Sequence, residues 1–310
     1  MGHRFTGIIA YQQLPEQLSN KILTILEKHP EYQSHFIEEM PEEIVNASQE
    51  IKGAWLFSQM ACWPDVIKDP DLHYDPQHRR WHYINLPILL TDSDERYYKD
   101  NVPSNLERLP NNDKPDDWNI SQAYHFNKDL LGKSDSALQA VALCWLFHLI
   151  GDIHQPLHST AVYNERRFAK GDAGGNSIDV KPIGILHAAW DRATYNEGNK
   201  NWNFEDYVNY CDSSLSRYYA DKDDLTERLE FEGWLQESYE LAKVVGYPKE
   251  LLDMIRSSAI EQYGFGNPLR IKLDKTFTSS WYSQIVSVAN HRISLAGFRI
   301  GGILRLIYAE

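Results

Sequence analysis

The 310-residue sequence contains few cysteines and few basic residues, and each shortage excludes a class of protein. Its three cysteines, Cys62, Cys144 and Cys211, are too few for a paired disulfide framework. One disulfide with a free thiol and three buried thiols are both compatible with this number. Lysine and arginine total 31 against 44 acidic residues, which gives a formal net charge of −13. This charge argues against a basic protein that binds nucleic acid by neutralising its phosphates.

Repeats and low-complexity segments are also missing. No segment is long and apolar enough to predict a membrane span, and no signal peptide is visible. Neither a Gly-x-Ser-x-Gly nucleophile elbow nor a phosphate-binding P-loop occurs. No linker divides the chain, so we expect a single domain over residues 1–310.

Apolar residues recur at helical spacing through most of the chain, which predicts an all-α fold. Residues 69–80 and 99–118 are rich in Asp, Pro and Asn and predict loops. Gly174-Gly175 followed by Asn-Ser-Ile-Asp-Val predicts a turn into one short β-hairpin that reaches Ile185. The predicted helices cover residues 16–29, 136–151, 225–245, 249–263 and 279–308.

Two His–Asp pairs are spaced four residues apart: His148 with Asp152, and His187 with Asp191. Residues at this spacing share one face of a helix, so each pair can offer an imidazole nitrogen and a carboxylate oxygen to one metal ion. A single pair of this kind is usually a surface hydrogen bond, but the presence of two favours a metal site. Histidine and aspartate without cysteine suit zinc in an open catalytic site.

Further histidine and aspartate residues surround these pairs. Pro156 ends the first helix and lets His158 turn back toward the same place. Upstream, Asp65 lies in Ala-Cys-Trp-Pro-Asp-Val-Ile-Lys, His82 lies in Trp-His-Tyr-Ile-Asn, and His3 lies in Gly-His-Arg.

Taken in order, these segments and Asp-Ala-Gly-Gly-Asn at 172–176 resemble the trinuclear-zinc nucleases, secreted fungal and plant enzymes that cut single-stranded nucleic acid and remove 3′-phosphates. That family is structurally related to the zinc-dependent phospholipase C of bacteria. The resemblance implies a single multi-helix domain with three zinc ions. The implied ligands are Asp65, His82, His148 and Asp152 for the first zinc, His158, His187 and Asp191 for the second, and His3 with the bridging Asp152 for the third.

The resemblance further implies a sugar-non-specific endonuclease on single-stranded DNA and RNA, with 3′-nucleotidase activity and 5′-phosphorylated products. A zinc-activated hydroxide would be the nucleophile. Asp65 would also orient the attacking water, and Lys68 would face the scissile phosphate. Tyr83 matches an aromatic residue that stacks on a base, with core packing as its alternative role. Asn85 would contact the base, and Asn176 would line the cleft or simply form a turn.

Some residues depart from the family pattern or distinguish its branches. Only Met-Gly precedes His3, whereas in the family a mature N-terminal Trp completes the third zinc site. Asp191 stands where the phospholipase branch has glutamate, which favours the nuclease. A phospholipase C and a non-catalytic metal-binding protein are the alternatives. Three zinc ions would add about +6 at the cleft and offset the acidic surface there. The family also implies a secreted or periplasmic location, and we expect a monomer.

Two more features near the motif carry expectations. Residues 159–171 are predicted as a loop, and their basic residues Arg166, Arg167 and Lys170 are expected to contact the nucleic-acid backbone. His154 lies inside the matching segment but is not a ligand in the family. We expect it to make a supporting hydrogen bond beside the ligands.

Overall fold

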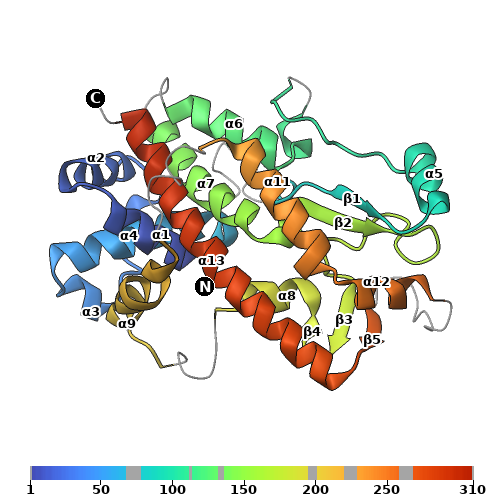
Figure 1. Cartoon of the computed structure of the whole chain (residues 1–310). Coiled ribbons are helices and arrows are strands. Elements are labelled where there is room, and N and C mark those ends of the chain that lie inside the picture. The colour runs from blue at the N-terminus through green and yellow to red at the C-terminus, as the bar shows by residue number, and fades with distance from the viewer. Residues whose placement is uncertain are drawn as a thin grey trace.

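The computed structural model describes residues 2–67, 78–111, 114–131, 136–194, 201–219, 229–257 and 268–308. Helices form most of this part of the chain, as Figure 1 shows, and the predicted all-α class is confirmed. The helices are α1 (Gly2–Gln13), α2 (Glu16–Leu26), α3 (Glu42–Val45), α4 (Gln49–Val66), α5 (Asp92–Asn101), α6 (Ile120–Leu131), α7 (Ser136–His154), α8 (Leu186–Asp191), α9 (Phe204–Tyr210), α11 (Phe231–Leu241), α12 (Lys249–Arg256) and α13 (Lys275–Tyr308).

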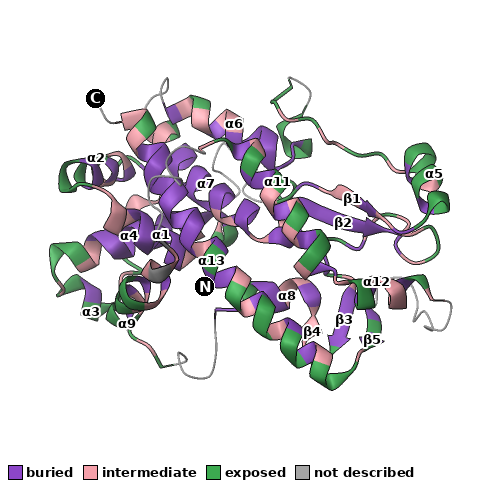
Figure 2. Cartoon of the chain, in the orientation of Figure 1, coloured by how far each residue is buried: buried purple, intermediate pink, exposed green. Residues whose placement is uncertain are grey.

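Helix α7 lies at the centre of the fold, and Figure 2 shows it buried along most of its length. It packs against α1, α2, α4, α6, α11 and α13. Its apolar residues extend around the whole helix rather than along one stripe, as expected for a helix surrounded by others. Within the described ranges it alone is long and apolar enough to cross a membrane, so the expectation that no segment has this length and apolarity was wrong. However, 78% of residues Ala137–His154 is buried inside the protein. We therefore assign it to the core.

Helix α1 is held between α4 and α13 by close contacts at glycine. A Cβ atom on Gly7 of α1 would lie 2.4 Å from the carbonyl oxygen of Phe57 in α4. A Cβ atom on Gly297 of α13 would lie 2.5 Å from the side chain of Ile9 in α1. Because neither distance is tolerated by a real side chain, glycine is required for this approach. The packing fixes α1, and with it His3, against the core.

The predicted β-hairpin is confirmed, and the structure adds strands that the sequence did not predict. In the hairpin, β3 (Ile178–Lys181) pairs antiparallel with β4 (Gly184–Ile185). On its other side β3 pairs in parallel with β5 (Leu269–Lys272). A separate parallel pair joins β1 (Leu86–Leu89) to β2 (Thr160–Tyr163). Strand β2 lies inside residues 159–171, so the prediction that this whole segment is a loop was wrong at its beginning.

The predicted helices have the following outcomes. Helix α2 ends three residues early, and α7 continues to His154, just before Pro156. Helix α11 is followed by a π-helical turn, Ala242–Gly246. Residues 225–228 and 258–263 of the predicted helices lie outside the described residues. Helix α13 begins four residues before its predicted start and contributes to both large hydrophobic clusters. Because α13 joins these clusters, we propose that the chain forms a single domain.

Candidate metal centre

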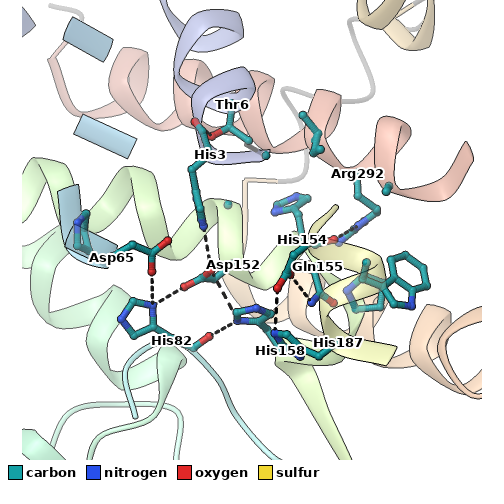
Figure 3. Close-up of a pocket in the computed structure, with 18 of the residues that line it drawn as sticks. His3, Thr6, Asp65, His82, Asp152, His154, Gln155, His158, His187 and Arg292 are labelled. Carbon is teal, nitrogen blue, oxygen red and sulfur yellow. Dashed lines mark hydrogen bonds and ion pairs between the residues drawn. The ribbon is translucent and has the colours of Figure 1, made fainter. Parts of the chain in front are cut away.

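The predicted ligands gather around one pocket of about 610 Å³ at the end of α7 (Figure 3). Such a volume is typical of a small-molecule or substrate site. Seven of the eight predicted ligands line it, and the eighth, His148, is fully buried and contacts several of them. The lining ligands are His3, Asp65, His82, Asp152, His158, His187 and Asp191.

The first cluster forms where α7, α4 and residues 78–85 meet. The Nε2 atom of His148 lies 2.9 Å from Nδ1 of His82 and 3.1 Å from Oδ2 of Asp152. Asp152 Oδ2 is also 2.9 Å from Nδ1 of His82. Asp65 Oδ1 lies 3.4 Å from His148 Nε2 and 4.0 Å from His82 Nδ1. Two imidazole nitrogens and two carboxylates thus point at a common centre.

His3 reaches the same cluster from α1. Its Nε2 atom is 3.2 Å from Oδ1 of Asp152, and its ring stacks on His148 with the ring centroids 3.9 Å apart. His3, Asp65 and His148 together form a further group whose ligand atoms lie within 4.8 Å of one another. Asp152 therefore lies between the donors of two neighbouring groups, as its predicted bridging role requires.

The second cluster contains His158, His187 and Asp191, whose ligand atoms also lie within 4.8 Å of one another. His187 Nε2 is 3.6 Å from Oδ2 of Asp191, one turn later on α8. His158 comes from the 3-10 turn Pro156–Ser159, which is separated from α7 by Gln155 alone. Asp152 Oδ1 lies 3.6 Å from Nδ1 of His158, so the two clusters are adjacent.

Backbone carbonyls orient three of these imidazoles. A carbonyl oxygen can only accept a hydrogen bond, so each Nδ1 atom that contacts one carries the proton. In the neutral ring, Nε2 is then the acceptor and faces the pocket, an arrangement common in metal-binding histidines. The Nδ1 atom of His148 lies 2.8 Å from the carbonyl oxygen of Ala61. That of His158 lies 2.6 Å from the carbonyl oxygen of His82, and that of His187 lies 2.8 Å from the carbonyl oxygen of Gly174.

Electrostatics also favour a cation at the first cluster. Burial raises the pKa of Asp152, but His148 and His158 outweigh burial and hold the pKa well below its usual range. Burial lowers the pKa of His148, while Asp152 and Asp65 outweigh it and raise the pKa to about 9. The carboxylates of Asp152 and Asp65 thus favour positive charge at their centre. This donor set fits a bound metal ion.

Comparison with known proteins agrees with this arrangement. The S1/P1 nuclease family model matches residues 1–309. The chain belongs to this family. Endonuclease 3 of Arabidopsis thaliana is 28% identical over 268 residues, which cover 81% of this chain and 76% of that protein. Nuclease S1 of Aspergillus oryzae is 33% identical over 113 residues, which cover 36% of this chain and 32% of that protein. Membership in the family supports a nuclease, and therefore a hydrolase.

The predicted substrate-binding residues of this family member lie outside the pocket lining. Tyr83 is 38% exposed, which excludes the alternative that it packs in the core. Asn85 is half-buried, and neither residue lines the pocket within the described ranges. Asn176 is exposed and donates from its side chain to the carbonyl oxygen of Ala173 at 2.9 Å, which fits a turn role. Lys68 lies outside the described residues.

The basic residues after β2 lie in two environments. Arg166 and Lys170 are exposed. Arg167 is half-buried and donates to the carbonyl oxygen of Ser257 at 2.7 Å. None of the three lines the pocket as described. Their predicted contact with a nucleic-acid backbone stays a prediction.

Several pocket residues were not predicted as functional. Gln155 lies within the motif but has no ligand-type side chain. Arg79 is exposed on the pocket, whereas Arg292 is buried beneath it. The sequence offered one signal of a functional role for Arg79, which is its position three residues before the predicted ligand His82. His154, expected to make a supporting hydrogen bond, contacts the carbonyl oxygen of Ile150 through Nδ1 at 2.7 Å.

Gly151 leaves the space that His3 occupies. A Cβ atom at this position would lie 2.5 Å from His3 Nδ1, so Gly151→Ala should displace the ring and weaken metal binding at the His3 group. Alanine otherwise favours a helix by about 1 kcal/mol, so the metal-free variant should fold. Zinc per chain and metal-free thermal unfolding would be measured.

Gly233→Ala is the matched control, because nothing lies within 4 Å of a Cβ there in α11. The free energy of unfolding of this variant should rise by about 0.5–1 kcal/mol, and the variant should keep all its zinc. Full zinc occupancy in the Gly151 variant would contradict the steric argument.

Asp172 fixes the turn that precedes β3. Its Oδ1 accepts the N–H of Val162 at 2.9 Å, and its Oδ2 accepts the N–H of Gly175 at 2.9 Å and the hydroxyl of Tyr247 at 2.7 Å. Gly174 in this turn has φ +58° and presents the carbonyl oxygen that orients His187. The Gly-Gly turn is therefore part of the support of the second cluster.

Asp172 should also make stability depend on pH. Burial raises its pKa from 3.8 to about 6, against the hydrogen bonds, so the folded state holds a proton that the unfolded chain releases near pH 4. Its contribution to the free energy of unfolding is thus full below pH 4 and falls by about 3 kcal/mol as the pH rises through 6. Asp172→Asn should remove this dependence. Urea unfolding at pH 4 to 7 measures it, and parallel pH curves for both proteins would contradict it.

Proposed function

We propose that this protein is a zinc-dependent phosphodiesterase that cleaves single-stranded DNA and RNA, with 3′-nucleotidase activity and 5′-phosphorylated products. One observation carries the proposal: histidine and aspartate donors from distant segments converge on one pocket in a chain of the S1/P1 nuclease family. The donor set contains imidazole and carboxylate without thiolate, which suits zinc with open coordination positions.

We propose three zinc ions. Asp65, His82, His148 and Asp152 would hold the first, His158, His187 and Asp191 the second, and His3 with Asp152 would contribute to the third. Bound zinc supplies charge stabilisation at a phosphoryl group and lowers the pKa of water. The three groups of candidate ligands around Asp152 support this number.

The residues of the chain would position the reactants. Asp65 lines the pocket and its side chain is 56% exposed, so it can accept a hydrogen bond from the attacking water while it faces His148. Its role would be orientation rather than strong base catalysis. Arg79, which is exposed on the pocket, would offer positive charge to the phosphate backbone. Arg292 is buried and lies 2.6 Å from Glu237, which also pairs with Arg299 at 2.7 Å.

Other parts of the proposal rest on the family resemblance. Lys68 would face the scissile phosphate, while Tyr83, Asn85 and Asn176 would contact the base or line the cleft. About +6 from three zinc ions would offset the net charge of −13 where phosphate binds. We further propose a secreted or periplasmic monomer. The three cysteines, Cys62, Cys144 and Cys211, are free thiols in the structure.

The test is hydrolysis by the zinc-loaded protein of a single-stranded oligodeoxynucleotide, a matched RNA and a 3′-nucleoside monophosphate. End-group analysis should find 5′-phosphates, and a duplex of the same sequence should be cut more slowly. Phosphatidylcholine vesicles test the phospholipase alternative. A protein that binds zinc and hydrolyses phosphatidylcholine but no nucleic acid would contradict the proposal. A protein that binds zinc and hydrolyses none of these substrates would favour the non-catalytic alternative.

A further inference from the structure

We propose that Gln155 is a positioning residue that holds two ligands of one zinc ion, His158 and Asp191, in place. This inference rests on the zinc site of the proposed function. Gln155 lies between the end of α7 and the turn Pro156–Ser159, and it lines the pocket. It is neither histidine nor acid, so it belongs to none of the candidate ligand groups.

The two ends of the Gln155 amide contact different elements. Its Oε1 atom accepts the backbone N–H of Leu157 at 2.6 Å, which caps the turn that carries His158. Its Nε2 atom donates to Oδ1 of Asp191 at 3.1 Å, 36 residues further along the chain. One side chain therefore connects the turn that carries His158 to the helix that carries Asp191.

The contact with Asp191 selects which carboxylate oxygen faces the metal position. The Asp191 side chain is 49% exposed at the last residue of α8, where a carboxylate would otherwise sample several rotamers. With Oδ1 held by Gln155, Oδ2 lies toward His187 at 3.6 Å from its Nε2 atom. A ligand fixed in advance loses less conformational entropy when the metal binds.

The contact with Leu157 fixes His158 in a similar way. Besides the bond from the N–H of Leu157 to Gln155, the turn contains a second hydrogen bond. In it, the hydroxyl of Ser159 donates to the carbonyl oxygen of Pro156 at 2.6 Å. His158 Nδ1 then donates to the carbonyl oxygen of His82 at 2.6 Å. The turn is closed on both sides, and His158 Nε2 is left as the acceptor.

The main chain before Gln155 is itself held by buried groups. The carbonyl oxygen of His154 accepts from Nε of Arg292 at 3.2 Å, and that of Ile153 accepts from the hydroxyl of Ser238. Arg292 is 3% exposed and forms an ion pair with Glu237 at 2.6 Å. The last carbonyls of α7 are thus fixed to α11 and α13. Gln155 therefore projects from a fixed backbone.

The primary amide of Gln155 supplies both the acceptor and the donor that these contacts need. Glutamate could still accept from Leu157 but would place a second carboxylate against Asp191, and methionine of similar length could do neither. The two substitutions therefore separate the cap from the donation to Asp191. Gln139, half-buried in α7, donates to the carbonyl oxygen of Leu131 at 2.6 Å and does not line the described pocket. Gln139→Met is the matched control.

The experiment measures zinc retained per chain while the folded, zinc-loaded proteins are equilibrated with rising concentrations of a competing chelator. In both Gln155→Glu and Gln155→Met, one zinc should be bound about 10–100-fold more weakly, the usual effect of losing a support of a metal ligand. The other zinc ions and the whole Gln139→Met profile should match the wild type. A wild-type profile in Gln155→Met would overturn the proposal.

A wild-type profile in Gln155→Glu alone would also overturn it, because the cap would then be sufficient without the donation to Asp191. Nucleic-acid cleavage measured on the same samples reports the proposed function separately. A wild-type protein that retains zinc but cleaves no nucleic acid contradicts the nuclease assignment, while the zinc profiles of the variants still decide the role of Gln155. A wild-type protein that binds no zinc would overturn both.

Discussion

Replacing Asp152 by asparagine is expected to remove metal from the first cluster and the His3 group, and to reduce hydrolysis by about 1000-fold or more. Asp152 Oδ2 lies 2.9 Å from His82 and 3.1 Å from His148, while Oδ1 lies 3.2 Å from His3 and 3.6 Å from His158. Asparagine replaces one of these acceptors with an NH₂ donor. Metal ions contribute several kcal/mol of transition-state stabilisation, and each 1.36 kcal/mol is tenfold in rate.

The measurement is zinc per chain together with the rate of oligonucleotide hydrolysis. Asp179→Asn is the matched control, because Asp179 is also buried but pairs with Lys181 at 3.0 Å in the small sheet, away from the ligands. Circular dichroism of the metal-free proteins checks that both variants fold. If the Asp152 variant kept the wild-type zinc content and rate, the prediction that Asp152 binds metal between the clusters would be wrong.

The sequence predicted those parts of the fold that local pattern determines. The apolar run of α7 and its end before Pro156 follow from helical periodicity and proline geometry. The Gly174-Gly175 turn has φ values of +58° and +85°, which glycine adopts readily, and the hairpin after it was predicted on that basis. The parallel pairing of β1 with β2 was missed because each strand has only four residues and its partner is distant in the chain.

In the candidate site, too, local sequence pattern predicted some contacts, while others depend on tertiary packing. The spacing of His148 and Asp152 placed both on one helical face, and their side chains do meet. The approach of His3 and His82 to that face depends on tertiary packing, so the family resemblance, not the spacing, was needed to predict it. The contact between Gln155 and Asp191 could not be predicted, because it depends on the geometry of a turn and of a helix 36 residues away.

Removing bound metal is expected to abolish hydrolysis and to lower the Tm by about 10 °C. The nitrogens of His148 and His82 lie 2.9 Å apart beside the carboxylates of Asp152 and Asp65, so a cation bound by these groups should stabilise the folded protein. A site occupied at 1000 times its Kd stabilises the folded state by about 4 kcal/mol. For a domain of this size each kcal/mol corresponds to about 2–4 °C. Thermal unfolding with and without chelator measures the shift, and chelator already saturated with zinc is the control.

The identity of the ion that restores stability distinguishes a zinc site from a general cation site. Five of the eight predicted ligands are imidazoles, and imidazole nitrogen binds zinc well, whereas magnesium prefers oxygen ligands and keeps its water. Zinc should therefore restore both the Tm and hydrolysis, and magnesium at the same concentration should restore neither. Equal recovery with magnesium would show that the carboxylates alone bind the ion. A Tm unchanged by chelation, with hydrolysis lost, would show that packing of α1, α4 and α7 holds the ligands in place without metal.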